Sequence, residues 1–247
     1  MPFPTPATDE AAHAAAGFEA HPRPTLLSDF ILGCQDGIVN VLGIILGLSA
    51  ATHDVRLILV ATLAALGAES IAMGAVAYTS TLSRRRLYLA EMRREQIEMR
   101  DVPHIEREEV RTILVEWGYE GADLEQMLEG ICRNPKAMLE FMMAFELRIA
   151  PVEASAPRTS AYVVGTATVL GHLIPLVPFF FVGSDIFLGA GLSVTASAVS
   201  LFAIGWYEAT ITVGRWWRNG LQMVVIGLAG GFAGYLIGHF IGAVPGL

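Results

Sequence analysis

The sequence is poor in cysteine, which excludes two common ways of holding a small domain together. Its two cysteines, Cys34 and Cys132, lie in an apolar run and in an acidic segment. Neither belongs to a Cys-x-x-Cys pair or to a cluster with histidine. A disulfide framework and a zinc knuckle are therefore both unsupported.

Basic residues are scarce as well. The chain has 16 lysines and arginines against 24 aspartates and glutamates, which gives a formal net charge of −8 at pH 7. No basic stripe with interleaved aromatic residues occurs, so nucleic acid is excluded as a partner. A cationic partner suits this charge balance better.

Charge of either sign is nearly absent from long parts of the chain. The sequence is 53% hydrophobic and 16% charged with a mean hydropathy of +0.52, which is too apolar for a soluble domain. A hydrocarbon core about 30 Å thick requires roughly 20 apolar residues per helix. We therefore expect an all-α polytopic membrane protein in a lipid bilayer, with five transmembrane helices at 27–51, 57–80, 161–182, 186–209 and 219–242.

The positions of the arginines predict the orientation. Cytosolic loops of membrane proteins carry an excess of basic residues. If the N-terminus is cytosolic, only Arg56 lies near a helix end on the far side, whereas eight arginines lie near cytosolic ends: Arg23, Arg84, Arg85, Arg86, Arg148, Arg158, Arg215 and Arg218. The N-terminus and the segment between helices 2 and 3 are therefore expected in the cytosol.

The apolar runs divide the chain into four parts. Residues 1–24 lack the basic start and the cleavage site of a signal peptide and are expected to form a flexible cytosolic N-terminal tail. Transmembrane helices 1 and 2 occupy 25–83, and transmembrane helices 3 to 5 occupy 159–247. Between them, 84–158 is expected to be a cytosolic helical metal-binding domain.

The segment 84–158 is polar but has helical periodicity. Of the 24 acidic residues in the chain, 15 fall between Glu91 and Glu153. Apolar residues recur there at helical spacing between breaks that contain Pro or Gly, which predicts three helices. No proline separates Leu57 from Arg100, so the second membrane helix is expected to continue into the cytosol as one rod.

Three residues at bilayer depth are candidates for lining an ion path. Ionisable groups inside a membrane are costly and are functional candidates by default. At ~1.5 Å per residue, Asp36 in helix 1 and Glu69 and Met73 in helix 2 fall in one slab near the midplane. Glu69 and Met73 also share a helix face. A carboxylate with a thioether suits a transition metal better than Mg²⁺ or Ca²⁺.

Ordinary structural roles are the alternative for these residues. A methionine in a membrane helix is usually packing, and a buried Asp36 can hydrogen-bond to a neighbouring backbone group or to Asn40 one turn on. The two histidines of the apolar runs, His172 and His239, lack carboxylates at ligand spacing in the sequence. Both are expected to be packing residues or histidines whose tautomer a neighbouring group fixes.

The acidic segment carries a second candidate metal site. Glu91, Glu95 and Glu98 align on one helix face. A short connection at 101–105 folds the chain back, so that Glu106 and Glu109 can face Glu95 and Glu98. Carboxylates brought this close repel one another unless a cation or protons lie between them. The alternative is that these glutamates form an acidic helix face that is solvated and binds no metal. The candidate ligands are Glu95, Glu98, Glu106, Glu109, Met142, Met143 and Glu146.

A membrane di-iron oxidase is the weaker class. Ferritin-like di-iron centres use Glu-x-x-His pairs on helices. No such pair occurs within 84–158. The chain is therefore not expected to be an enzyme.

Several motifs in order along the chain resemble the vacuolar iron transporter family, which includes plant vacuolar and yeast Ca²⁺-sensitivity-complementing transporters. The resemblance covers nearly the whole chain from Leu27 to Gly242. The motifs are Gln35-Asp36-Gly37, Gly47-Leu48-Ser49, Ala72-Met73-Gly74, Arg93-Arg94-Glu95-Gln96, Val102-Pro103, Arg133-Asn134-Pro135, Phe141-Met142-Met143-Ala144-Phe145-Glu146-Leu147 and the run from Leu170 through His172 to Pro178.

The resemblance implies a homodimer with an ion path at the dimer interface and proton-coupled export of Fe²⁺ from the cytosol. Some members of the family also handle Mn²⁺ and other divalent ions. By this resemblance Asp36 and Met73 line the path, and the carboxylates and methionines of the acidic segment bind the metal. No resident cofactor is implied.

One position departs from the family pattern. Relatives of the plant type have a glutamate in helix 2 two turns before the methionine, where this chain has Ala65. The chain instead has Glu69, one turn later on the same helix face. We expect that this carboxylate has moved one turn along the same path.

Two function classes remain. The first is a dimeric transporter that exchanges Fe²⁺, with Mn²⁺ as a second candidate, for protons. The second is a membrane-anchored metal-sensing or metal-buffering protein without transport, which has no use for Asp36, Glu69 and Met73 inside the bilayer. With 15 arginines and one lysine the composition favours a prokaryotic cytoplasmic membrane, and a eukaryotic source would imply the vacuolar membrane.

Overall fold

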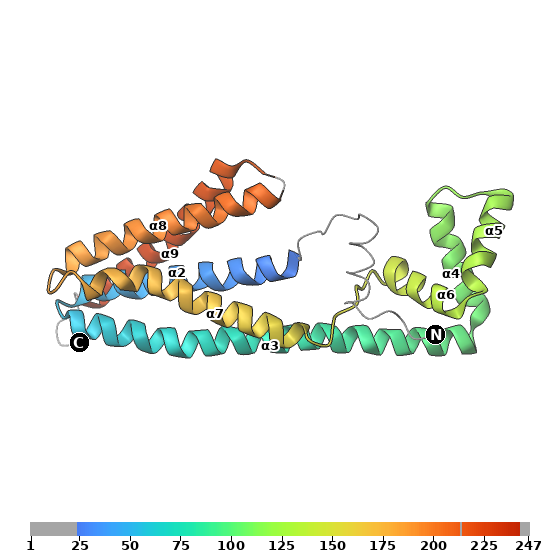
Figure 1. Cartoon of the computed structure of the whole chain (residues 1–247), viewed down its shortest axis with the longest axis horizontal. Coiled ribbons are helices and arrows are strands. Elements are labelled where there is room, and N and C mark those ends of the chain that lie inside the picture. The colour runs from blue at the N-terminus through green and yellow to red at the C-terminus, as the bar shows by residue number, and fades with distance from the viewer. Residues whose placement is uncertain (1–23, 213, 243–247) are drawn as a thin grey trace, which may run out of the picture. The chain divides into compact units, whose positions relative to one another are not determined.

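The computed structural model describes residues 24–212 and 214–242, and within these every regular element is helical (Figure 1). The predicted N-terminal tail lies outside the described residues except for Pro24. The α-helices are α2 (Pro24–Ala51), α3 (Val55–Asp101), α4 (Pro103–Glu116), α5 (Gly121–Cys132), α6 (Pro135–Phe141), α7 (Ala156–Leu176), α8 (Ile186–Ile211) and α9 (Trp216–Gly242). A π turn, η1 (Met142–Glu146), follows α6, and a 3-10 turn, η2 (Val177–Phe180), follows α7.

Five helices in the described part of the chain are long and apolar enough to cross a membrane, as the sequence predicted. They are α2, α3, α8, α9 and the combination of α7 with η2. Many of their apolar side chains point outward, and Ile71 and Phe187 are about three quarters exposed, at 76% and 75%. Side chains of this kind are stable on a surface only when lipid or another helix covers them. The chain is therefore an integral membrane protein.

Helix α3 is continuous over 47 residues, which confirms the prediction of a single rod. The chain divides into two compact units, and α3 contributes to both: the first unit holds residues up to Ile71 and from Val163 onward, and the second holds Ala72–Tyr162. The predicted boundaries at 83/84 and 158/159 concern the side of the membrane and stay a prediction.

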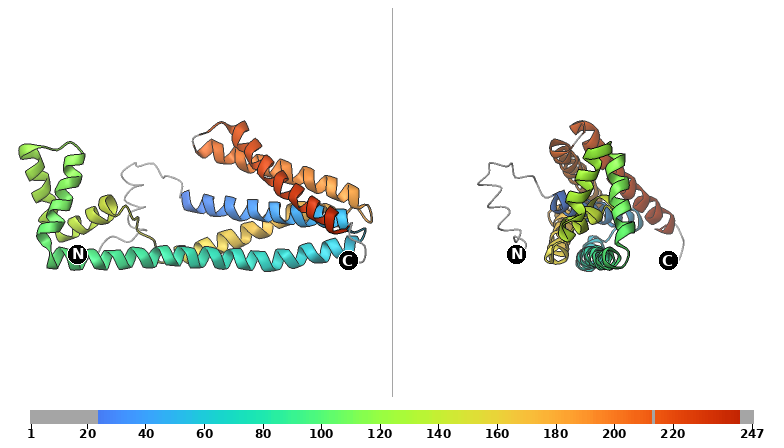
Figure 2. Two further views of the ribbon diagram at one scale, coloured as in Figure 1. Left: turned by 180° about the vertical axis from the view of Figure 1, so that it is seen from behind. Right: turned by 90° about the vertical axis from the view of Figure 1, so that its right-hand side faces the viewer.

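In the first unit, α9 packs along both α2 and α8 (Figure 2). Glycines allow the close approach of α2 and α9, because a Cβ at Gly234 would meet the backbone of Gly43 and a Cβ at Gly238 would meet the backbone of Gly47. The Gly43/Gly47 pair is the GxxxG spacing of the sequence, which permits backbones to come near each other in a membrane.

Two prolines end α7 in the same unit. Pro175 lies in the last turn of α7, and Pro178 lies in η2, where the helix tightens. Pro175 has its own carbonyl satisfied from the next helix, because the hydroxyl of Ser193 donates to it at 2.5 Å. This contact ties α7 to α8, whose first turn is capped by Asp185 through the backbone N–H of Leu188 at 3.0 Å.

In the second unit, proline and asparagine set the helix starts. Pro103 begins α4, and Asn134 caps α6 by accepting hydrogen bonds from the backbone of the next turn. The core of the unit is apolar and consists of Val110, Leu114, Leu124, Leu128, Met138, Phe141 and Met142.

The predicted number of three helices between 84 and 158 is wrong. The end of α3 is followed by α4, α5 and α6, so the segment holds four helical stretches before α7 begins. Helix α5 forms separately because Gly118 and Gly121 both adopt positive φ angles, 89° and 57°, and turn the chain between α4 and α5.

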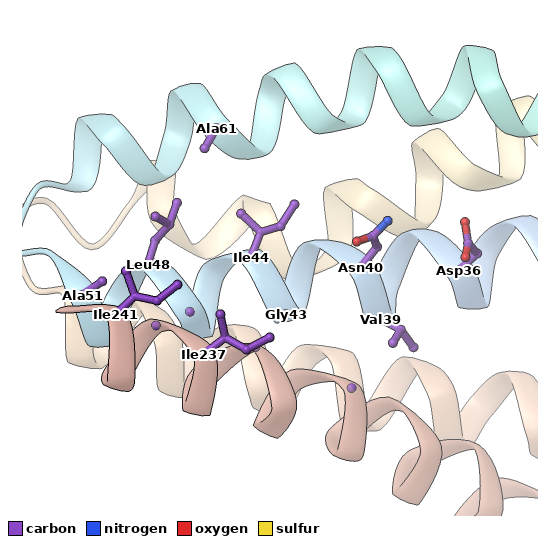
Figure 3. Close-up of a pocket in the computed structure, with 14 residues that line it drawn as sticks. Asp36, Val39, Asn40, Gly43, Ile44, Leu48, Ala51, Ala61, Ile237 and Ile241 are labelled. Carbon is purple, nitrogen blue, oxygen red and sulfur yellow. The ribbon is translucent and has the colours of Figure 1, made fainter. Parts of the chain in front are cut away.

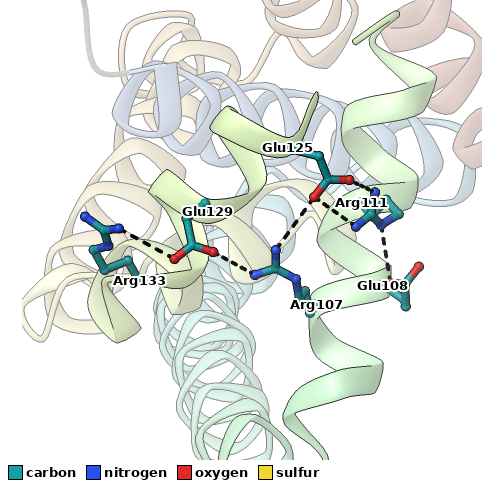
Figure 4. A network of polar contacts seen from close by, with 6 residues as sticks. All are labelled: Arg107, Glu108, Arg111, Glu125, Glu129 and Arg133. Atoms are coloured by element: carbon teal, nitrogen blue, oxygen red, sulfur yellow. Dashed lines mark hydrogen bonds and ion pairs between the residues drawn. The ribbon is translucent and has the colours of Figure 1, made fainter. Parts of the chain in front are cut away.

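Arginine–glutamate pairs join the outer faces of α4 and α5 (Figure 4). Arg107 lies 3.3 Å from Glu129 and 3.9 Å from Glu125, and Arg111 also contacts Glu125. These acids are neutralised by neighbouring guanidinium groups. They are therefore unlike the glutamates of the candidate metal site.

Candidate functional site

The carboxylate of Glu69 is held between two helices of the first unit. The side-chain amide of Asn40, on α2, donates to Oε1 of Glu69, and Oε2 lies 2.9 Å from Nε2 of His172 on α7. Only 18% of the Glu69 side chain is exposed, and none of the His172 side chain. Both carboxylate oxygens of Glu69 therefore have specific protein partners.

His172 has a carboxylate neighbour that the sequence did not reveal. Its ring lies against a carboxylate that is 103 residues away in the sequence, so no local spacing could reveal the pair. The available signal was a histidine inside an apolar run just before two prolines. The other membrane histidine, His239, is exposed on α9 and stacks against Tyr235.

Asp36 does not bond to Asn40 in the way the sequence suggested, because the amide nitrogen of Asn40 is directed to Glu69. The Oδ2 atom of Asp36 is buried, with no hydrogen-bond partner in the described part of the chain. Asp36 is also close enough to Glu69 for a side-chain hydrogen bond, which two carboxyl groups form only when one of them is protonated, and it interacts electrostatically with Glu69 and His172. An unpartnered carboxylate oxygen at such a position is costly unless a cation or a proton reaches it.

A cavity of about 720 Å³ lies beside these groups, between α2, α3 and α9 (Figure 3). Asp36 and Asn40 are one helical turn apart on α2 and both line it. The rest of the lining is apolar or glycine, including Ile44, Leu48 and Ile237. The two polar side chains are thus concentrated in one part of an otherwise apolar space.

Met73 is half-buried on α3, one turn beyond Glu69 along the same helix. It falls in the second unit, whereas Asp36, Glu69 and His172 belong to the first. Its assignment to the ion path stays a prediction.

The second unit brings three predicted ligands together. One carboxylate oxygen from each of Glu95, Glu98 and Glu106 lies within 4.8 Å of the other two. Glu95 and Glu106 are almost fully buried, and each has an Oε2 atom without a hydrogen-bond partner among the described residues. Oxygen donors at this spacing fit a divalent cation.

The charges of these glutamates act on one another. Burial raises the pKa of Glu106 to about 7, and the charges of Glu109, Glu95, Glu146 and Glu98 add to the effect. The side chain of Glu146 is exposed overall, yet partial burial of its carboxyl and the charges of Glu109, Glu95 and Glu98 raise its pKa to about 7 as well. The group therefore binds protons near neutral pH and would exchange them for a cation.

Few positive side chains lie near the glutamates of this candidate metal site. Arg94 lies 3.2 Å from Glu98 and 3.8 Å from Glu91. Within residues 24–212 and 214–242, no ion pair reaches Glu95, Glu106, Glu109 or Glu146, in contrast to the paired acids of α4 and α5. The carboxylates of this site thus remain available to a cation.

The two methionines and Glu146 share the π turn η1. Met142 and Met143 are buried, and Met142 belongs to the apolar core of the unit. Wide turns of this type often occur at functional sites because they change the direction of a side chain. The place of the thioethers in a ligand set stays a prediction.

Comparison with known proteins shows the family of the chain. The model of the VIT family matches residues 27–239, which is most of the chain. The chain belongs to the VIT family. The resemblance inferred from the motifs is thereby confirmed.

Curated members of the family are similar over most of their length. Vacuolar iron transporter 1 of Oryza sativa subsp. japonica is 32% identical over 232 residues, which cover 91% of each chain. Vacuolar iron transporter 1 of Arabidopsis thaliana is 30% identical and covers 87% of this chain and 86% of its own. Protein CCC1 of Saccharomyces cerevisiae is 28% identical and covers 91% of this chain and 72% of its own. The plant relatives are iron transporters by name, not enzymes.

Proposed function

We propose that the chain transports Fe²⁺ across a membrane, with Mn²⁺ as a second substrate, and exports the metal from the cytosol in exchange for protons. The observation that carries the proposal is that two carboxylates lie inside a membrane-spanning unit: Asp36, whose Oδ2 atom is buried, and Glu69, of which 18% of the side chain is exposed. Membership in a family whose relatives are named iron transporters supports the same class.

The acidic group of the second unit serves as the capture site in this proposal, with Glu95, Glu98 and Glu106 at its centre and Glu109, Glu146, Met142 and Met143 around it. It would lie in the cytosol, where the arginine distribution of the sequence places it. Because its proton affinity lies near pH 7, metal and protons compete for these carboxylates, and metal uptake is accompanied by proton release.

The path itself would run past Asp36, Glu69 and Met73 at the interface of a homodimer. The cavity beside Asp36 and Asn40 supports a route for an ion along α2. A protein that only buffers or senses metal would need the acidic group alone. The buried carboxylates of the membrane unit favour transport over that alternative.

The test is metal flux into liposomes that contain the purified chain, measured for Fe²⁺ and for Mn²⁺ with and without a pH gradient. We expect the metal flux to increase when the pH gradient drives protons in the direction opposite to the metal. Binding of metal without flux would favour the buffering function.

A further inference from the structure

Both ring nitrogens of the buried His172 have partners, and one of these partners fixes the hydrogen on Nδ1. Nδ1 lies 2.8 Å from the carbonyl oxygen of Thr168, and Nε2 lies 2.9 Å from Oε2 of Glu69. A carbonyl oxygen only accepts, so Nδ1 must carry a hydrogen. In the neutral ring, Nε2 then presents its lone pair to Glu69.

The surrounding packing keeps the ring in this orientation. A Cβ at Gly37 would lie 2.7 Å from Nδ1 of His172 and 2.5 Å from the carbonyl oxygen of Thr168, so α2 presses against that edge of the ring. The amide of Asn40 occupies Oε1 of Glu69, which leaves Oε2 for the ring. The structure therefore directs an imidazole nitrogen and a carboxylate oxygen at each other.

Two acceptors this close repel each other unless a positive group lies between them or beside both. A hydrogen can take that position, and so can a metal ion. Adjacent N and O ligands of one octahedral ion, each about 2.1 Å from it, stand roughly 3 Å apart. The observed N–O separation is 2.9 Å, which suits this arrangement as well as a hydrogen bond. Histidines that bind metals commonly donate their other N–H to a backbone carbonyl, as His172 does.

We propose that His172 supplies a nitrogen ligand, beside the carboxylates of Glu69 and Asp36, to a divalent transition metal in the membrane unit. An imidazole with carboxylates suits Mn²⁺, Fe²⁺ and Zn²⁺ and gives little advantage to Ca²⁺ or Mg²⁺. Asp36 fits the third place because its buried Oδ2 has no partner among the described residues and it interacts electrostatically with the other two.

The neighbouring helices bring few competing groups to this site. On α2 the other titratable side chain nearby is the buried thiol of Cys34, and α8 carries no acid or base from Ile186 to Trp206. The inference rests on the proposed function in that the bound metal is the transported one.

The experiment uses the full chain in detergent with Mn²⁺ as the probe, in a background where Glu95, Glu98 and Glu106 are changed to Gln so that the acidic group does not compete. Pulsed electron paramagnetic resonance with ¹⁵N-labelled histidine then reports whether a histidine nitrogen coordinates Mn²⁺. We expect this coupling in the background protein and its loss in His172→Gln, with Mn²⁺ affinity falling by more than about tenfold. His239→Gln is the matched control and should retain both.

A second variant covers the case in which His172→Gln does not fold. Glu69→Gln keeps the hydrogen bonds, because its amide can accept from Asn40 and donate to Nε2 of His172, but it removes the charge that holds the metal. It should fold and lose the nitrogen coupling. Absence of the coupling in the background protein, or its persistence in His172→Gln, would overturn the inference.

Flux of Mn²⁺ into liposomes, measured on the wild-type chain, separates this inference from the proposed function. Flux without histidine coupling would contradict the ligand role of His172 and leave transport standing. Coupling without flux would support the metal site and contradict transport.

Discussion

Gly37 on α2 lies so close to His172 on α7 that a Cβ at position 37 would come within 2.7 Å of Nδ1 of the ring. The same Cβ would lie 2.5 Å from the Thr168 carbonyl that holds this nitrogen. The glycine of the Gln35-Asp36-Gly37 motif thus has a steric role. It allows the helix that carries Asp36 to pack against the histidine that faces Glu69.

Gly37→Ala should therefore destabilise the membrane unit and reduce transport. A methyl group at this place meets backbone and a buried ring that cannot move away, and overpacking of this kind costs about 1–3 kcal/mol. The measurement is the thermal unfolding midpoint in detergent together with metal flux. Gly67→Ala is the matched control, because a Cβ at Gly67 meets nothing within 4 Å, and it should unfold no earlier than the wild type.

The acidic group should make the metal-free protein less stable as the pH rises. Glu106 has a folded-state pKa of about 7 against an ordinary value of 4.5, so the folded chain binds more protons than the unfolded chain between these values. The stability that this group contributes is present below about pH 4.5 and is lost as the pH rises through 7. Glu106→Gln should flatten the fall of the unfolding midpoint between pH 5 and pH 8.

Glu125 provides a control of opposite sign. Its hydrogen bond to Arg111 lowers the pKa of Glu125, so its contribution to stability is present above the ordinary pKa and is lost as the pH falls. Glu125→Gln should lower the unfolding midpoint at pH 8. It should not change the fall of that midpoint with rising pH that Glu106 causes. If Glu106→Gln and Glu125→Gln changed the profile in the same way, the assignment of the raised pKa to Glu106 would fail.

Metal binding by the acidic group should strengthen as the pH rises toward 8. Protons compete with the metal for Glu106 and Glu146, whose pKa values are about 7. Below pH 7, affinity should change by up to about tenfold per pH unit for each proton displaced. Calorimetry with Mn²⁺ on the full chain checks this, and Glu106→Gln with Glu109→Gln should weaken binding sharply. Unchanged affinity in that double variant would contradict a capture site.

The sequence alone predicted the five membrane helices and the continuous α3, because apolar runs and the absence of proline are local signals. It also predicted Asp36 and Glu69 as candidates, since acids inside such runs are rare. It missed His172 because the role of that residue comes from a tertiary contact with Glu69 across 103 positions. It did not count α5 as a helix of its own, although breaks with Gly and Pro stand on both sides of this short stretch.

The hypothesis that the helix 2 carboxylate has moved from position 65 to position 69 makes a prediction of its own. Glu69→Ala should be severely defective in flux, because it leaves His172 without its partner. Adding Ala65→Glu should restore only part of the flux, since the new carboxylate projects from the same face about 6 Å away along the axis. Normal flux in Glu69→Ala would show that this carboxylate does not serve the path. A folded but inactive double variant would leave the relocation unsupported.

In the proposed function, an ion crosses the membrane past the carboxylate of Asp36. This is tested by the initial rate of Fe²⁺ flux into liposomes for the wild-type chain and for Asp36→Asn, at equal amounts of folded protein. The amide keeps the shape of the side chain but lacks the charge that holds a dication, so we expect that flux is abolished while Glu69 and His172 keep their contact. Flux near the wild-type rate in Asp36→Asn would contradict it.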